Sequence, residues 1–555
     1  MSRLPGLRQA ISSSGVSLWL FPLVLLVIFF FIPMGSILGV MAARQGVVTT
    51  RDVLQPLGFT FFQAFVSTLL TLTAGLPVAY VFARFDFPGK ALLRTLTLLP
   101  FILPTVVVAA AFNALLGPRG WVNLGLMQLL GLQSPPVTFL NTFPAILVAH
   151  VFYNISIIIR VVGASWSQLD PRLGYSAQVL GASPWKTFIH VTLPMLRRGI
   201  LSAALLVFFF DFTSFGVILL LGGPRFSTLE TSIYYQAVSM FNLRLAGVLS
   251  VIQLLCTLGI SWLYASSSGN RDVPFFPRLQ GEGTRRPRSR REKWVILAVI
   301  VFIMLLQVLP LAALVGRSFT RLEADLGQRG EVNAGLTLDF YRELFVNRQG
   351  SIFYVPPVRA ALNSLVYGVI TVLISLAAGL LLAYALRVRT RRNRWLEVLV
   401  MLPFGASAVT LGLGFILAFD KFATFPLLVP LAHSLVAMPF VYRTIQPALS
   451  SMPESLRQSA AVLGASPRQV FRSVELKLIQ RPLGVAAIFA FMLSLGEFGA
   501  TTFIARPDRP TLPVAIFRYL SQPGAMNYGQ AMAMATLLIL LCGGCIWALE
   551  RLNRV

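Results

Sequence analysis

The sequence predicts an all-α polytopic membrane protein made of two parallel repeats of six helices each. Of the 555 residues, 56% are hydrophobic and only 12% are charged, which is more apolar surface than a soluble core can hide. Apolar runs of about 18 residues or more recur along the chain, and each can cross a hydrocarbon layer of about 30 Å as a helix. The pentapeptide LGASP also occurs twice, at Leu180–Pro184 and Leu463–Pro467.

Twelve segments are predicted to span the membrane. The first begins near Val16 and is longer than the apolar region of a cleaved signal peptide, so we expect it to remain as a helix. The expected limits are 16–40, 58–82, 92–116, 140–162, 199–222 and 245–266 in the first half, and 294–316, 360–386, 395–418, 426–442, 484–505 and 530–549 in the second. An even number of spans per half gives both halves the same orientation.

Basic residues concentrate on one side of this layout. With the N-terminus in the cytoplasm, every segment that faces the cytoplasm is rich in Arg or Lys, as the positive-inside rule requires. These segments are 83–94, 163–198, 267–293, 387–394, 443–483 and the C-terminal ERLNRV. Membrane topology therefore explains the formal net charge of +26, and nucleic acid is not expected as a partner. We expect a multi-pass protein in contact with membrane lipid, with both termini in the cytoplasm.

The two halves repeat at a constant offset of 283 residues. YSAQVLGASPWKTFIHVTLPMLRRGI (175–200) lies over QSAAVLGASPRQVFRSVELKLIQRPL (458–483), and twelve of these 26 positions are identical. The same offset places Phe215-Gly216 over Phe498-Gly499. The expected organisation is a first helix and outer loop (1–57), a first repeat (58–266), a basic cytoplasmic linker (267–293), a helix and outer loop (294–359) and a second repeat (360–549).

Each LGASP lies in a cytoplasmic loop of about 40 residues that carries helix signals. Asp170 can cap a short helix that begins with Pro171, and Gly181 can end it in the left-handed conformation. Ser183 then caps a second helix with Pro184 at its first position. The second copy has Gly464, Ser466 and Pro467 in these places, and the short helices carry the small residues Ser176, Ala177, Ser459 and Ala460.

This loop resembles the EAA loop of the inner-membrane components of binding-protein-dependent ABC importers. The family pattern is EAA, three residues, Gly, nine residues and Ile-x-Leu-Pro. The first copy matches it with Tyr175-Ser176-Ala177, Gly181 and Val191-Thr192-Leu193-Pro194, and the second with Gln458-Ser459-Ala460, Gly464 and Val474-Glu475-Leu476-Lys477. Both copies lack the Glu of the family, and Lys477 replaces the usual Pro, which bears on the polar contacts to the partner.

The resemblance implies the type I ABC importer permease fold in a bacterial inner membrane. Each loop would dock on one of two copies of a separate ATPase subunit, and a periplasmic or lipid-anchored solute-binding protein would deliver the ligand. ATP and Mg²⁺ would be bound by the ATPase, because the chain has no GxxxxGK[ST] phosphate loop. The chain is thus expected to be a transport subunit without a cofactor or an enzymatic activity of its own.

A fused chain with two six-helix halves resembles the thiamine permeases and the ferric-iron permeases of this superfamily. The segments LVAHVFYN (147–154), FTSFGVILLLGGPRFSTLETSIY (212–234) and LSLGEFGATTF (493–503) are more similar to the thiamine type. Thiamine or its phosphates are therefore the first expectation for the cargo, and ferric iron is the alternative.

Four ionisable residues inside predicted spans are candidates for the translocation path: Asp211, Glu497, His150 and His433. Carboxylates that face a central path would suit a cationic cargo, and the alternative role is hydrogen bonding between helices. The two histidines occupy equivalent positions in the repeat. They could meet at a pseudo-twofold axis and contact a metal, or each could hydrogen-bond its own neighbours.

Two other classes of protein compete with this interpretation. An ion-coupled secondary transporter would use Asp211 and Glu497 as cation sites, but it has no need for two copies of a docking loop. A membrane enzyme is disfavoured because the three histidines and the remaining sequence form no recognisable catalytic pattern. The outer segment 317–359 is either part of the receptor for the binding protein or a solvated loop.

Overall fold

A computed structural model of the chain describes residues 18–43, 48–268, 284–321, 335–346, 355–387, 391–422 and 424–554. These residues are helical apart from turns and one antiparallel pair of short strands, β1 (Thr320–Arg321) and β2 (Gly335–Leu336). Within them, eleven helices are long and apolar enough to cross a membrane, or twelve if one bent pair is counted as a span. The predicted all-α membrane fold is therefore confirmed. The expectations for residues 1–17 and for 269–283 of the linker lie outside the described residues.

The first half begins with a helix from Leu18 to Ala42. Its named helices are α2 (Ile32–Ala43), α3 (Thr50–Arg84), α4 (Lys90–Leu96), α5 (Leu99–Ile102), α6 (Thr105–Leu116), α7 (Trp121–Leu130), α8 (Phe143–Ser167), α9 (Pro171–Val179), α10 (Pro184–Thr187), α11 (Leu193–Phe212), α12 (Leu229–Tyr234) and α13 (Leu243–Ser268). π-helical turns occur at η1 (Val27–Phe31), η2 (Phe188–Thr192), η3 (Ile218–Gly222) and η4 (Tyr235–Ser239).

The second half follows a similar order and begins with α14 and α15, which together form one candidate span, as the first helix does in the first half. Its helices are α14 (Arg290–Ile303), α15 (Leu309–Ser318), α16 (Asp339–Arg342), α17 (Pro357–Ala385), α18 (Arg391–Gly405), α19 (Ala408–Phe419), α20 (Leu428–Ser450), α21 (Glu454–Val462), α22 (Pro467–Val470), α23 (Leu476–Gly496), α24 (Gly499–Ile504), α25 (Leu512–Leu520) and α26 (Ala525–Arg554). The short turns are η5 (Met304–Val308), η6 (Glu343–Phe345), η7 (Asp420–Phe422) and η8 (Phe471–Glu475).

Four spans predicted as continuous helices are broken in the structure. The segment 92–116 is divided among α4, α5 and α6, and 395–418 bends by 96° between α18 and α19. The spans predicted at 199–222 and 484–505 are interrupted after Phe212 and after Gly496. Pro100 and Pro104 explain the first break, because proline has no amide hydrogen to donate and disfavours helix in the preceding residue. Hydropathy does not reveal these breaks, because the residues at the breaks are also apolar.

The breaks occupy equivalent places in the two repeats, and the hydrogen bonds around them are equivalent too. The hydroxyl of Thr60 on α3 accepts a hydrogen bond of 2.9 Å from the amide of Leu229, at the start of α12. The hydroxyl of Ser364 on α17 accepts one of 2.7 Å from the amide of Leu512, at the start of α25. The repeat found in the sequence therefore extends to polar contacts between segments that are far apart in the chain.

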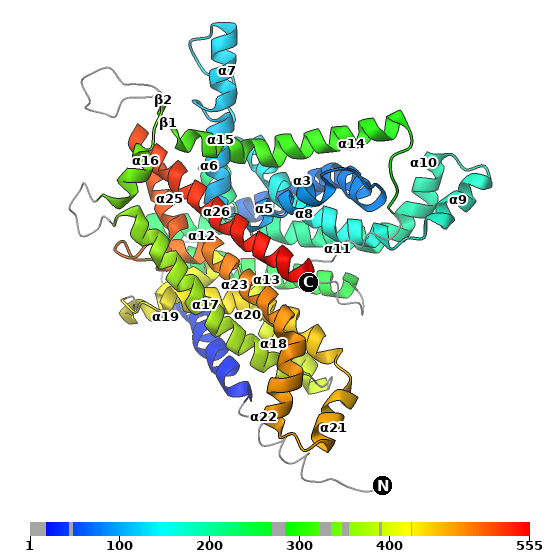
Figure 1. Cartoon of the computed structure of the whole chain (residues 1–555). Helices are drawn as coiled ribbons and strands as arrows, with labels where there is room; N and C mark the ends of the chain where they lie inside the picture. Colours follow the sequence, from blue (N-terminus) through cyan, green and yellow to red (C-terminus); the bar gives the residue numbers. More distant parts are fainter. Residues whose placement is uncertain are drawn as a thin grey trace.

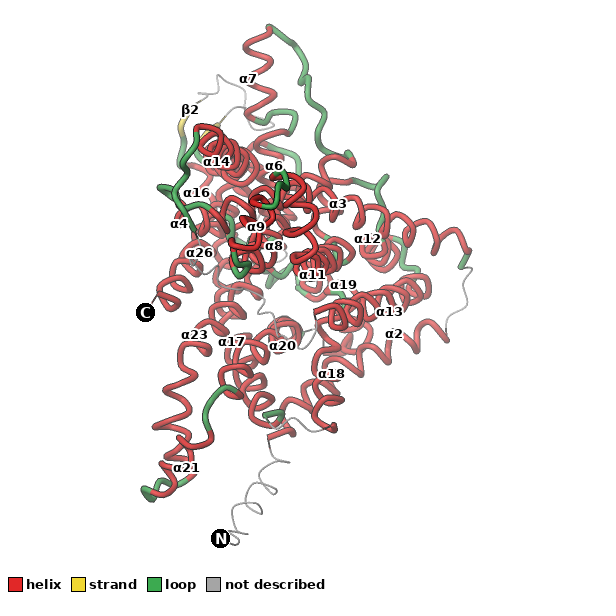
Figure 2. The backbone as a smooth tube through the Cα atoms, turned by 90° about the vertical axis from the view of Figure 1, so that its right-hand side faces the viewer, coloured by secondary structure: helices red, strands yellow, loops and turns green. Residues whose placement is uncertain are grey.

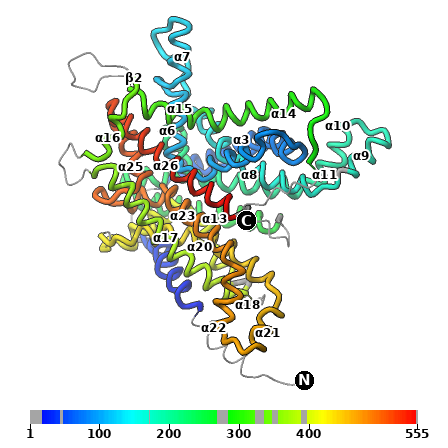
Figure 3. Tube along the Cα trace, viewed as in Figure 1, coloured from blue at the N-terminus to red at the C-terminus, as the bar shows by residue number. Residues whose placement is uncertain are grey.

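The first helix of each half packs on the other half. Helix α2 lies against α19 of the second half and against α13, and α15 lies against α6 of the first half and against α26. Figure 3 shows the dark-blue α2 beside the yellow-green helices of the second half, and the green α14 along the blue α3. Phe29 of the first helix stacks on Phe415 of α19 with ring centroids 6.1 Å apart. Because each half packs its first helix on the other half, the two halves are held together.

Two loops and one helix project from the body of the molecule. The loops that carry α9–α10 and α21–α22 extend away in different directions, and α7 projects in a third (Figure 1 and Figure 2). Near α7, the start of α16 is linked to β1 because Asp339 lies 3.7 Å from Arg321. The C-terminal end of α26 lies beside α4, where the Thr95 hydroxyl donates a hydrogen bond to Glu550.

Candidate functional site

The first LGASP loop forms a short helix, a left-handed turn and a capped second helix, as the sequence predicts. The carboxylate of Asp170 accepts a hydrogen bond of 2.9 Å from the amide of Arg172 at the start of α9. Gly181 has φ +90°, a value that only glycine adopts without strain. The hydroxyl of Ser183 accepts from the amide of Lys186 and caps α10. The chain then continues through η2 into α11, so α10 is attached to a membrane-crossing helix.

The second loop repeats this geometry in α21 and α22. Gly464 has φ +83°, and Ser466 and Gln469 form a reciprocal capping box at the start of α22. The chain enters α23 through η8, as α10 enters α11 through η2. Leu193 and Pro194 are the first two residues of α11, and Leu476 is the first residue of α23. Position 477 is helical in the second copy, so the missing proline leaves the local fold intact.

The tips of both loops expose apolar side chains at equivalent positions. Val179 and Leu180 are 87% and 88% exposed, and Val462 and Leu463 are 86% and 87% exposed. These residues lie at the end of α9 and α21, directly before the glycine turns. Large aliphatic side chains that project this far gain nothing from packing inside the chain, so both loops present the same uncovered apolar surface.

The second loop is tied to its membrane scaffold by an ion pair that the first loop lacks. The guanidinium of Arg457 on α21 donates to Glu475, which also accepts from the hydroxyl of Tyr384 and lies 3.8 Å from Arg387. Gly174 and Thr192 occupy the positions of Arg457 and Glu475 in the first copy. The four groups hold α21 against the C-terminal end of α17.

A segment of the linker supports the first half at the corresponding end of α3. The backbone of Arg285 pairs with Arg84 and Asp86 through hydrogen bonds of 3.0 Å and 2.9 Å. Its guanidinium lies 5.0 Å from the Phe85 ring and donates to Glu292 at 3.0 Å and 2.5 Å. These bonds to Glu292 raise the pKa of Arg285. The linker therefore makes specific contacts where it rejoins the membrane domain.

In the first half, His150 on α8 is the centre of a buried polar cluster. Its Nδ1 hydrogen-bonds with Ser67 at 2.9 Å, and its Nε2 with Ser214 at 2.8 Å. Oδ1 of Asp211 lies 3.5 Å from the same Nδ1 and accepts a hydrogen bond of 2.6 Å from Asn154. The cluster joins α3, α8 and the end of α11.

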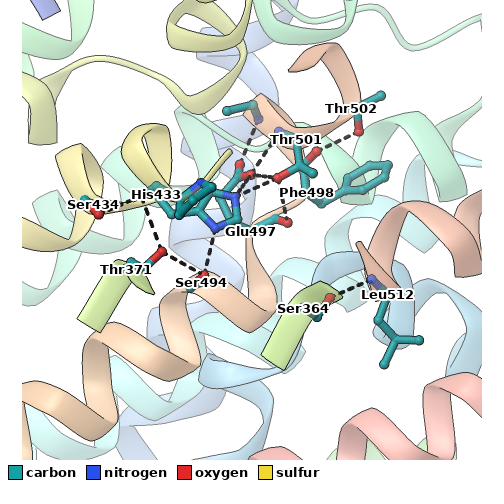
Figure 4. Close-up of polar contacts among 12 residues, drawn as sticks. Ser364, Thr371, His433, Ser434, Ser494, Glu497, Phe498, Thr501, Thr502 and Leu512 are labelled. Carbon is teal, nitrogen blue, oxygen red and sulfur yellow. Dashed lines mark hydrogen bonds and ion pairs between the residues drawn. The ribbon is translucent and has the colours of Figure 1, made fainter. Parts of the chain in front are cut away.

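The equivalent cluster in the second half surrounds His433 on α20 (Figure 4). Its Nδ1 hydrogen-bonds with Ser494 at 2.8 Å, and its Nε2 with Thr501 at 2.8 Å. Oε2 of Glu497 lies 3.2 Å from Nε2. The carboxylate of Glu497 also accepts from the amides of Ala500 and Thr501 at 2.8 Å and 2.9 Å, and so caps α24. A carboxylate at the N-terminus of a helix is favoured by the unpaired amides there.

The two clusters have the same arrangement of helices, but the carboxylate occupies a different position in each. Asp211 aligns with Ser494, and Glu497 aligns with Ser214, so each histidine has one carboxylate and one hydroxyl at opposite places. The structure brings together His150 with Asp211 and His433 with Glu497. It does not bring the two histidines together, because each is hydrogen-bonded within its own half. No group of three or more His, Cys, Asp or Glu that could hold a metal occurs in the described part of the chain.

At the breaks after α11 and α23, two equivalent phenylalanines meet. The rings of Phe215 and Phe498 stack with centroids 5.7 Å apart and an interplanar angle of 23°. Equivalent residues of two repeats can touch each other only at the axis that relates the repeats, so this pair lies on the pseudo-twofold axis. The following glycines are tightly packed: a Cβ at Gly216 would lie 2.0 Å from Oγ1 of Thr105, and one at Gly499 would lie 3.0 Å from Cβ of Ala408.

A third buried carboxylate, Glu230, lies on α12 between the halves and is completely buried. Its Oε1 accepts a hydrogen bond of 2.8 Å from Nε2 of Gln253 on α13. Its Oε2 has no hydrogen-bond partner, and neither has Oε1 of Gln253. Helix α12 also packs against α19 of the second half, where Ser407 is close to the Glu230 carboxyl group.

Comparison with known proteins places these features in a family. The sequence profile of the binding-protein-dependent transport system inner membrane component matches residues 72–271 and 375–552, one match in each half. The chain belongs to this family. It is therefore the permease of a binding-protein-dependent ABC importer, a multi-pass component of the inner membrane that works with a solute-binding protein and an ATPase.

The permease is similar over most of its length to several curated proteins. The thiamine transport system permease protein ThiP of Escherichia coli is 29% identical over 511 residues, which cover 89% of this chain and 88% of that protein. The protein of the same name from Haemophilus influenzae is 27% identical over 510 residues, with the same coverage of both chains. A probable ABC transporter permease protein of Sinorhizobium fredii is 24% identical over 538 residues, which cover 93% of this chain and 90% of that protein.

Among solved structures, the permease is similar to a chain of a bacterial alginate ABC transporter in complex with an alginate pentasaccharide-bound periplasmic protein. The TM-score is 0.41 and the sequence identity 20%, over 47% of this chain and 96% of that chain.

Sequence reasoning missed Glu230 and the stacked phenylalanines of this permease. The segment 223–244 falls between the spans predicted at 199–222 and 245–266, whereas in the structure its helix α12 packs between the halves. One signal was present in the sequence: Thr228-Leu229 aligns with Thr511-Leu512 in the second repeat, and an outer loop without structure needs no such agreement. The aligned Phe215-Gly216 and Phe498-Gly499 were visible too, but their meeting at the axis was not.

Proposed function

We propose that this permease forms the path by which thiamine, or one of its phosphates, enters the cell after delivery by a solute-binding protein. The observation that carries the proposal is the similarity to thiamine permeases over 89% of the chain, with both halves included. The buried carboxylates near the axis support it, because thiamine is a cation. The described residues contain no cluster of three side chains that could bind a metal ion, so they offer no such site for the alternative cargo, ferric iron.

The proposal assigns ATPase docking to the two LGASP loops. Ser176, Ala177, Gly181, Ser183, Pro184, Leu193 and Pro194 would form the first docking element, and Ser459, Ala460, Gly464, Ser466, Pro467 and Leu476 the second. Each would receive one copy of an ATPase subunit that binds ATP and Mg²⁺. The exposed Val179-Leu180 and Val462-Leu463 pairs supply apolar surface for this contact, and the direct connection to α11 and α23 transmits its movement.

The test uses the complete transporter. The permease, its ATPase and its binding protein are reconstituted in liposomes, and ATP hydrolysis is recorded with empty, thiamine-loaded and ferric-loaded binding protein. Stimulation by the thiamine-loaded protein, with accumulation of thiamine inside, is the expected result. If only the ferric-loaded protein stimulates ATP hydrolysis, the cargo is ferric iron and not thiamine. If the permease associates with no ATPase, the docking assignment is wrong.

A further inference from the structure

The unpaired oxygens around Glu230 point to a ligand. Glu230 is held in a fixed position, since the reciprocal capping box of Thr228 and Thr231 starts α12 and the side chain of Gln253 donates to Oε1. Oε1 of Gln253 is a buried acceptor without a hydrogen-bond partner, and Oε2 of Glu230 has none either, although the hydroxyl of Ser407 lies near the carboxyl group. Burying an acceptor without a hydrogen-bond partner is unfavourable, so these two adjacent acceptors destabilise the protein when no ligand is bound. A ligand that brings hydrogen-bond donors or positive charge removes this destabilisation.

This group of acceptors lies between the halves. Helix α12 packs against α13 of its own half and α19 of the other. Ser407 caps α19 by accepting a hydrogen bond of 3.0 Å from the amide of Thr410, and its hydroxyl lies near the Glu230 carboxyl group. A movement of one half relative to the other therefore changes the surroundings of Glu230.

Aromatic rings continue the same face of α12. Tyr234 follows Glu230 by one helical turn and so lies on the same side of the helix. Its ring is 5.4 Å from Phe215 and 5.6 Å from Phe503 of the second half, and Phe215 stacks on Phe498. Two rings from each half thus surround the axis next to the carboxylate.

A carboxylate beside several aromatic faces has a definite chemical preference. Ring faces attract cations and stack on flat rings, and the carboxylate adds charge attraction and accepts hydrogen bonds. We propose that Glu230, Gln253, Tyr234, Phe215, Phe498 and Phe503 form a transit site for a flat aromatic cation that carries a hydrogen-bond donor. The site deepens the proposed function and rests on it for the cargo, since thiamine has a positively charged thiazolium ring and an aminopyrimidine ring.

In this structure the site is closed. Glu230 and Gln253 are fully buried, and the stacked Phe215 and Phe498 fill the axis. The ligand would enter when the halves separate and the four rings part. The rings then exchange contacts with each other for contacts with the ligand, so little apolar surface is exposed to water at any stage.

Direct binding tests the site without the binding protein. Equilibrium dialysis measures the affinity of the purified permease–ATPase complex for two probes, with and without a non-hydrolysable ATP analogue. The probes are thiamine and its neutral analogue, in which a thiophene ring replaces the thiazolium. We expect thiamine to bind at least about tenfold more tightly than the neutral analogue in one of the two nucleotide states, as charge attraction in a desolvated aromatic site predicts.

Three variants separate the contributions. Glu230→Gln keeps the acceptor for Gln253 and removes the charge, so it should bring the two affinities within about twofold of each other. Tyr234→Ala should weaken both probes, because both have flat rings, and should lower their ratio less than Glu230→Gln does, because the carboxylate keeps its charge. Asp420→Asn, an exposed acid-to-amide change on the outer turn η7, is the matched control and should alter neither.

The outcomes distinguish the site from the proposed cargo. Wild-type protein that binds both probes equally or binds neither, or a Glu230→Gln variant with an unchanged ratio, would overturn the site. Charge-selective binding that depends on Glu230 supports the site even if the liposomes accumulate no thiamine, a result that would refute thiamine as the cargo. Thiamine uptake without charge-selective binding would support the proposed function but refute the proposed transit site.

Discussion

Phe215 and Phe498 stack on each other although 283 residues separate them in the chain. Each follows the break in the fifth span of its repeat, and each precedes a glycine that packs against the start of α6 or α19. Four broken spans therefore come together around one pair of rings. A cargo that passes along the axis between the halves would therefore require these two rings to move apart.

We predict that joining these two positions arrests transport. The double variant Phe215→Cys/Phe498→Cys, linked with a short bifunctional maleimide and reconstituted with its ATPase and binding protein in liposomes, should lose uptake by more than about tenfold, because the axis can no longer open. Uptake and ATP hydrolysis are measured before and after the reagent. Each single cysteine variant serves as the control and should keep most of its activity. Full uptake by the linked protein would show that the path does not pass between these rings.

The glycine turns in the two loops should not accept a long side chain. Gly181→Arg and Gly464→Arg place a residue with a Cβ at φ +90° and +83°, which costs about 1–2 kcal/mol in the left-handed conformation. The space around both glycines is open, so the protein should still fold. We expect uptake to fall by at least about tenfold because the docking surface is distorted. Asparagine tolerates this conformation, and Gly181→Asn should therefore retain uptake.

The exposed tips of the loops should control binding of the ATPase and leave stability unchanged. Leu180→Asp and Leu463→Asp alter side chains that are 88% and 87% exposed, so the change in unfolding free energy should be within about 0.5 kcal/mol. Association with the ATPase should weaken by about tenfold or more for each loop, as expected when a charge enters an apolar contact. Pull-down of the ATPase and the melting temperature of the permease give the two readouts. Unchanged association in the double variant would exclude the tips from the contact.

The ion pair of Arg457 and Glu475 should stabilise only the second loop. Both side chains are mostly buried, at 12% and 7% exposed, so Glu475→Gln, which weakens the charge-assisted hydrogen bonds, should destabilise α21 locally by about 2 kcal/mol. Hydrogen exchange of the amides of α21 should accelerate, while that of α9 stays constant, since Gly174 and Thr192 make no such pair. Thr192→Val is the matched control in the first loop. Equal acceleration in both loops would mean that the effect of Glu475 is not local.

Much of this fold was readable from the sequence because a membrane imposes strong rules. The lengths of the apolar runs and the positions of the basic loops predict the membrane-spanning helices. The repeated LGASP predicts two loops with the same helix caps and the same left-handed glycines. Gly181 and Ser183 could be assigned because caps and left-handed turns depend on a few neighbouring residues. The family followed from the same stretch.

The interior was harder to predict because its contacts join distant segments. His150 and His433 were correctly paired as equivalent residues, but whether they met each other depended on the breaks in α11 and α23, which hydropathy does not register. Asp211 and Glu497 lie at different places around the two histidines. This difference could not be predicted without knowing how α3 and α17 pack beside them. Glu230 was overlooked because a short helix that re-enters the protein has the composition of a loop.

The exchange of first helices has a consequence for biosynthesis. The first helix ends near Ala43, but its packing partner α19 begins only at Ala408. At about 5–20 residues per second, the ribosome needs roughly 20–70 seconds to make the chain between them. During that time one face of the first helix has no partner within the nascent chain and must be covered by lipid or by the insertion machinery. The order of synthesis thus makes the union of the two halves a late event, completed only when most of the second half has been inserted.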